Sequence, residues 1–160
     1  MKCFRFICIL TVFLGISTWV QGQNASCTGS EYTTNSEFFR AAATAQSGDA
    51  TASKKKAAIS ARNAMTSQIK AKAEMAAKSQ SKFGSSETEA FLELVEMAIQ
   101  QEVAHLKVIC EDSRQTAGRY KTNVVVELPK ASVLGSIIGL AKSDDKLKGL
   151  FEEGKFKEEF

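Results

Sequence analysis

Residues 50–82 constrain the fold most, because they contain neither proline nor glycine and consist mainly of Ala, Lys, Ser and Gln. Such a composition favours an unbroken helix, about 50 Å long at roughly 1.5 Å per residue. Large apolar residues are sparse in this segment, and alanines such as Ala61 and Ala73 fill the rest of one face. This face permits close backbone approach but buries little area. A helix of this kind requires a second long element beside it.

A second long helix is predicted behind the capping box at residues 86–89, where Glu87 and Glu89 accompany Ser86 and Thr88. Its apolar residues are spaced 3, 4, 4, 3 and 4 apart: Leu92, Val95, Ile99, Val103, Leu106 and Cys110. This spacing is a heptad seam, typical of a coiled coil or helical bundle. Gly118 is predicted to end the helix.

The two predicted helices have opposite charge. Residues 50–82 contain eight basic residues and one acidic residue, whereas residues 87–112 contain seven acidic residues and one basic residue. A three-residue turn, Gly84 to Ser86, is expected to join the two helices. A short loop between helices of matched length predicts an antiparallel helical hairpin.

The remaining segments are predicted to complete an all-α domain over residues 35–153. A capping box at residues 34–37 predicts a short helix over 35–47, which a bend near Gly48 separates from the long one. C-terminal helices over 130–142 and from about 143 are expected to pack on the hairpin, and the charged tail 154–160 is expected to fray. Residues 124–128 favour extended structure ahead of Pro129. Whether they form strand or coil is left open, because no partner strand is evident.

The N-terminus has the pattern of a secretory signal. Lys2 and Arg5 precede an apolar stretch over residues 6–16. Residues 20–22 are small or are otherwise tolerated before a signal-peptide cleavage site, so cleavage is expected after Gly22. The stretch is too short for a membrane span, so residues 1–22 are expected to be cleaved, leaving a soluble extracellular chain. Loss of two basic residues lowers the net charge from +3 to +1, so global charge does not indicate nucleic acid as a partner.

Two cysteines remain after cleavage of the signal. Cys27 and Cys110 are expected to form a disulfide within one chain, with an intermolecular bridge as the alternative. In the hairpin, Cys110 would lie near Ala58, at the end remote from Gly84, and the bend near Gly48 would help Cys27 to reach it. Cys27 belongs to an extended arm, residues 23–34, which also contains Asn24 in an N-glycosylation sequence.

No residue pattern predicts catalysis, a metal or a cofactor. The single histidine, His105, follows Glu102 in one E-x-x-H motif, whereas di-metal bundles use that motif twice with two further carboxylates. No nucleophile elbow or glycine-rich phosphate loop occurs. The chain is therefore expected to be non-enzymatic.

Two segments suggest partners. The run Lys54–Lys56 begins a basic helix face that suits an acidic glycan or anionic lipid, although the acidic helix is expected to neutralise it. Nucleic acid is not expected, because no aromatic residues are interleaved. Residues 130–151 are amphipathic, as in helices at a membrane surface, but packing into the core is the preferred interpretation.

The leader, the alanine- and lysine-rich helix and the acidic heptad helix together resemble small secreted, alanine-rich helical proteins of insects. The resemblance covers residues 50–120, is compositional and implies no activity or site. The sequence predicts a secreted protein that binds an extracellular partner, a protein or a glycan. The alternatives are a lipid-binding protein using residues 130–151 and a structural protein that self-associates through the heptad seam; the oligomeric state is left open.

Overall fold

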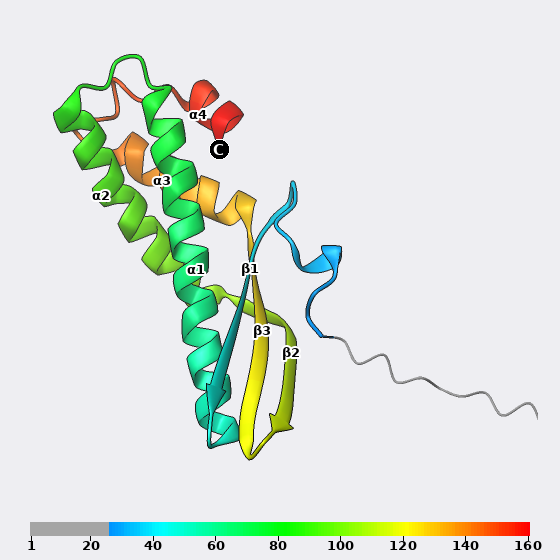
Figure 1. Ribbon diagram of the computed structural model, residues 1–160. Coiled ribbons are helices and arrows are strands. Elements are labelled where there is room, and N and C mark those ends of the chain that lie inside the picture. Colours follow the sequence, from blue (N-terminus) through cyan, green and yellow to red (C-terminus); the bar gives the residue numbers. More distant parts are fainter. Residues whose placement is uncertain (1–25) are drawn as a thin grey trace, which may run out of the picture.

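In the computed structural model, which describes residues 26–160, a three-stranded antiparallel sheet packs against a long helix (Figure 1). The expected all-α fold is therefore wrong, and the domain is mixed α/β. The predicted signal, residues 1–22, and the glycosylation site at Asn24 lie outside the described residues.

The sheet has the order β1-β3-β2, so that β3 is the central strand. Along the chain the elements are η1 (Ser30–Tyr32), β1 (Phe38–Ser47), α1 (Ala50–Lys78), α2 (Ser85–Glu102), η2 (Val103–His105), β2 (Lys107–Thr116), β3 (Arg119–Pro129), α3 (Lys130–Ser143) and α4 (Glu153–Glu159). Both pairs of neighbouring strands are antiparallel. β1 and β3, the first and the last strand along the sequence, thus pair with each other.

The segment expected to form the short N-terminal helix is β1. The side chain of Asn35 accepts hydrogen bonds from the backbone N–H groups of Glu37 and Phe38, so the apparent capping box forms a turn that leads into a strand. Along β1, Phe39 and Ala41 are buried, whereas Ala42 is exposed. Pairing with the valines of β3 outweighs the helix preference of the alanines.

The chain changes direction near Gly48, as expected, but between a strand and a helix rather than between two helices. Asp49 caps α1 by accepting a hydrogen bond from the backbone N–H of Ala52 at 2.7 Å. In the first turns of α1, the buried Oγ of Ser53 lies 3.0 Å from the carbonyl oxygens of both Ala45 and Tyr120. This hydroxyl ties the helix to β1 and β3.

The second predicted helix ends at Glu102 instead of continuing to residue 112. The chain then enters β2, and β2 and β3 form a hairpin. Ala117 and Gly118 connect the two strands with φ values of 49° and 73°, which is the left-handed geometry of a tight hairpin turn. Gly118 therefore marks a hairpin rather than a helix end, and β2 supplies a partner that the sequence did not reveal for residues 124–128.

A β-bulge at Ile109 changes which way the residues of β2 face. Val108 pairs with Val126, but Cys110 pairs with Val125, so Ile109 is left without a partner in the register. Val126 and Val125 point to opposite faces of β3 because successive strand residues alternate. Val108 and Cys110 consequently face opposite sides of the sheet, although they are two residues apart.

The helical layer contains the expected antiparallel pair α1 and α2, joined across their surfaces by an ion pair between Lys70 and Glu96. The N-terminal part of α1 covers β1 and β3, and α2 packs beside α1 and α3 (Figure 1). On α3, Val133, Ile137 and Ala141 are buried, so the apolar side of this segment belongs to the core. No helix within residues 26–160 is long and apolar enough to cross a membrane.

The C-terminal tail is ordered, contrary to the expectation that it frays. It forms α4, whose Phe156 is fully buried. The ring of Phe156 lies 5.4 Å from that of Phe91 on α2, and Phe160 lies 5.7 Å from Phe39 on β1, both measured between ring centroids. The charged residues of the tail face solvent while its aromatic residues close one end of the core.

Candidate functional site: the groove between α1 and β2

A groove forms because the sheet is wider than the helix that covers it. α1 packs on β1 and β3, and this leaves the helix-facing side of β2 uncovered. The exposed fractions of Ile59 on α1 and Val108 on β2 are 60% and 55%. The groove has a volume of about 350 Å³ and is lined by Lys55, Ala58, Ile59, Arg62, Leu106, Val108 and Val126. We call it the α1–β2 groove.

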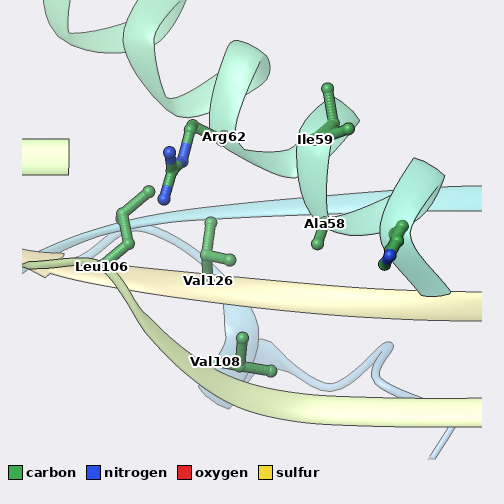
Figure 2. A pocket seen from close by; sticks show the side chains of 7 residues that line it. Ala58, Ile59, Arg62, Leu106, Val108 and Val126 are labelled. Carbon is green, nitrogen blue, oxygen red and sulfur yellow. The ribbon is translucent and has the colours of Figure 1, made fainter. Parts of the chain in front are cut away.

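Helical and strand periodicity place these side chains together. The four residues from α1 occupy positions i, i+3, i+4 and i+7, which lie on one helix face. Figure 2 shows Val126 and Val108 pointing from their strands toward the helix, while Arg62 points from α1 toward Leu106. Val126 is buried and forms the floor. The bulge at Ile109 matters here, because it lets Val108 face the groove while Cys110, two residues later, faces the opposite side of the sheet.

The charges of the groove are all positive. Lys55 and Arg62 are its only charged lining residues, and neither forms an ion pair with any other residue in the range 26–160. They are two helical turns apart, which is about 10 Å along the axis. Beside them, Lys54 pairs with Glu111 of β2 at 2.8 Å. The groove therefore combines an apolar floor with two unneutralised cations.

The basic face of α1 is neutralised less than expected. Of its seven basic residues, only Lys54 and Lys70 form ion pairs with acidic residues of the described chain. Glu111 belongs to β2, so α2 supplies a single partner, Glu96. The acidic heptad helix ends at Glu102, too early to lie beside the cations in the first turns of α1.

The two cysteines expected to pair are joined in the structure, with Cα atoms 5.8 Å apart. Cys27 is buried beside Ala42 and Val125, on the sheet face that is opposite to α1. Val108, two residues before Cys110, lines the groove together with Ala58. The expectation that Cys110 lies beside Ala58 is therefore wrong, because Cys110 faces the side of the sheet that is opposite to α1.

The E-x-x-H pair does not form a joint site. Glu102 accepts a hydrogen bond from Ser136 of α3, and His105 is exposed at the end of η2. Within residues 26–160, no group of three His, Cys, Asp or Glu side chains is placed to hold a metal ion. The heptad seam also ends early, because Leu106 and Cys110 lie beyond the helices, while Val95 and Ile99 are buried in the chain's own core.

Sequence reasoning missed the groove because Val108 was assigned to a helix. The adjacent β-branched residues Val108 and Ile109 were the available sign of a strand. No protein-family model matches the chain, and no curated protein matches it either.

Proposed function

We propose that this chain is a secreted, non-enzymatic binding protein whose α1–β2 groove holds an apolar anion, such as a long-chain carboxylic acid. The observation that carries the proposal is the lining, in which five apolar residues accompany two cations and no acidic residue. A binding site for small molecules is typically a concave, mostly apolar surface with a few polar groups that fix orientation. The volume of about 350 Å³ falls at the lower end of the usual range.

The lining also suggests how such a ligand would lie. Its apolar body would cover Val126 between Ile59 and Val108, and its charged group would meet Arg62. The planar guanidinium of arginine can donate two parallel hydrogen bonds to one carboxylate. A charge-assisted hydrogen bond contributes roughly 1.5–3 kcal/mol. Burial of the apolar body adds about 25 cal/mol for each Å² removed from water.

Two further observations support secretion and binding without catalysis. The chain begins with the pattern of a secretory signal and contains a disulfide, Cys27–Cys110, which is typical of an oxidising compartment. The groove lining contains no carboxylate, histidine, serine or cysteine. The lining therefore lacks the carboxylate and imidazole groups that most often act in general acid–base catalysis, and Lys55 is the one common proton-transfer group in it.

The test is a fluorescence titration of the oxidised chain, residues 23–160, with dansyl-aminoundecanoic acid and with the corresponding uncharged alcohol. We expect saturable binding of the acid and binding of the alcohol that is about tenfold weaker, because the alcohol loses the charge-assisted contact. Ile59→Glu should weaken binding of the acid by about tenfold or more through repulsion and loss of apolar contact.

Met75→Glu is the matched control for this variant. Met75 is also on α1 and is 54% exposed, close to the 60% of Ile59, but it does not line the groove. The Met75→Glu variant should bind the acid with the affinity of the wild type. Equal loss in both variants, or equal affinity for acid and alcohol, would contradict the proposal.

A further inference from the structure

A second cavity lies on the face of the sheet that is opposite to α1, and its lining is polar throughout. It has a volume of about 380 Å³ and is lined by Ser26, Thr28, Thr44, Arg114, Lys121 and Asn123. We call it the outer-face cavity. Its strand residues share the side of the sheet on which the disulfide lies, since Thr44 pairs with Asn123 and Arg114 pairs with Lys121 in the registers. The cavity is therefore separate from the α1–β2 groove.

Two cations meet across neighbouring strands in this cavity. Arg114 of β2 and Lys121 of β3 are directly opposite each other, and like charges in such positions destabilise a sheet. Asp112 compensates one of them, because its Oδ2 lies 3.0 Å from the Nε of Arg114. Lys121 has no ion pair within residues 26–160. An anion bound between the two side chains would relieve their repulsion.

Hydrogen-bond donors complete the cavity. Oγ1 of Thr44 lies 2.6 Å from Oδ1 of Asn123, so this contact occupies the carbonyl of Asn123 and leaves its amide N–H groups able to donate. The hydroxyls of Ser26 and Thr28 lie 2.5 Å apart. These two residues flank Cys27, and the disulfide therefore fixes both hydroxyls against the sheet. The donors are held in place before any ligand arrives, which reduces the entropic cost of binding.

We propose that the outer-face cavity binds the oxyanion of an acidic carbohydrate, a sulfate or carboxylate group on an extracellular sugar. Lys121 provides the main anion contact beside Arg114, whose charge Asp112 already compensates. The hydroxyl and amide groups match the hydroxyl groups of the sugar ring. The exposed cations Lys54–Lys56 on α1 are the competing location for such a glycan, but the groove-side helix face offers no comparable set of neutral donors. The inference does not rest on the function proposed for the groove.

The experiment is an NMR titration of the uniformly ¹⁵N-labelled, oxidised chain with four probes. These are a heparin-derived tetrasaccharide, a hyaluronan tetrasaccharide, maltotetraose and sodium sulfate. We expect chemical-shift changes at Thr44, Lys121 and Asn123 with the acidic sugars and none with neutral maltotetraose. Binding of heparin alone identifies sulfate as the preferred oxyanion, whereas binding of both acidic sugars identifies the carboxylate as sufficient.

Lys121→Gln should weaken binding of the acidic tetrasaccharide by about tenfold or more, because one charge-assisted contact is lost. Lys121 is exposed, so the variant should fold, and unchanged amide signals away from the cavity in the ¹⁵N spectrum would verify this. Lys56→Gln, at an exposed position on α1, is the matched control and should bind the sugar as the wild type does. Equal weakening in both variants, or sodium sulfate binding as tightly as the tetrasaccharide, would overturn the proposal.

Discussion

Buried alanines lie on both surfaces of the interface between the sheet and α1. On β1, Ala41 faces the helix with Phe39, and on α1 fully buried Ala57 and Ala61 face the sheet. Small side chains on both surfaces let the helix approach the strands closely. Little area is buried for each residue, so the fit of the two surfaces matters more than the size of any side chain.

Neighbouring alanines of α1 should therefore respond differently to enlargement. Ala57→Leu places three more carbon atoms where the exposed fraction is 0%, and we expect a loss of about 1–3 kcal/mol in the free energy of unfolding. Ala58→Leu lies in the groove and should change stability by less than about 0.5 kcal/mol, while it weakens binding of the dansyl acid. Urea denaturation and the fluorescence titration measure the two effects. If both substitutions lowered the free energy of unfolding equally, Ala58 would have no free space beside it, which would contradict the presence of the groove.

At the scale of elements, periodicity predicted the helices that have a continuous apolar face but not the strands. The long helix and the next one were expected, and Leu92, Val95 and Ile99 do lie on α2. Beyond Glu102 the same spacing continued by coincidence into Leu106 and Cys110, which lie outside the helix. Spacing alone cannot separate a heptad from a bulged strand, because the bulge at Ile109 breaks the alternation by which a strand is recognised.

The strands β1 and β3 were difficult to predict for a different reason. β1 is rich in alanine, which favours helices locally, and its partner lies at the other end of the chain. Residues 124–126 are buried on both faces, by α1 on one side and the disulfide on the other, so they show no alternation. The groove and the outer-face cavity both depend on these pairings, and neither was predicted from the sequence.

The bulge gives a prediction about β2. Deleting Ile109 should remove the bulge and leave every pairing of β2 unchanged, so Val108 should still face the groove and Cys110 should still reach Cys27. Deleting Glu111 should instead let the strand run straight with Cys110 opposite Val124, on the face of α1. Titration of free thiols in denaturant should find none in the first variant and two per chain in the second. Free thiols in the Ile109 deletion would contradict this account of the bulge.

The attachment of α4 should depend on pH. Hydrogen bonds from Ser81, and then from Lys155, lower the pKa of Glu152 from its ordinary 4.5 to about 2. Hydrogen bonds from Lys157 and Lys142 likewise lower the pKa of Glu153 from 4.5 to about 2. Because both pKa values are lower in the folded state, these carboxylates stabilise the fold above pH 4.5, and their contribution is lost as the pH falls toward 2.

Thermal unfolding followed between pH 6 and pH 2 measures this effect. The melting temperature should fall through the window from about pH 4.5 to about pH 2, and the double variant Glu152→Gln, Glu153→Gln should show a shallower fall. Glu158→Gln, at an exposed position on the same helix, is the control and should follow the wild type. An unchanged slope in the double variant would show that the contacts of α4 do not hold in solution.

The whole molecule is organised around the sheet, which has a different kind of surface on each side. One side carries α1 and the apolar groove, and the other carries the disulfide, the N-terminal arm and the polar cavity. β3 contributes a residue to each surface: Val126 lines the groove, and Asn123 lines the outer-face cavity. The two proposed ligands would therefore bind to the same sheet without touching each other.

Loss of the disulfide should destabilise the whole molecule. It joins residues 83 positions apart, and the loop-entropy relation gives about 4.5 kcal/mol as the stabilisation from a loop of that length. The double variant Cys27→Ser, Cys110→Ser should lose about 2–4.5 kcal/mol of unfolding free energy in urea, and reductant should lower the stability of the wild type similarly. A loss below about 1 kcal/mol would mean that the arm remains on the sheet without the bond.

The pairing of β1 with β3 has a consequence for synthesis of the chain. Ala42 pairs with Val125, so β1 has no partner in the sheet until 83 further residues have been made. At roughly 5–20 residues per second this takes about 4–17 s. During that time the helical pair α1 and α2 can form from local contacts, but the hydrogen-bonding edge of β1 stays without a partner strand. The first strand to be synthesised is thus among the last parts to find its place, and the growing chain must avoid association with others until β3 emerges.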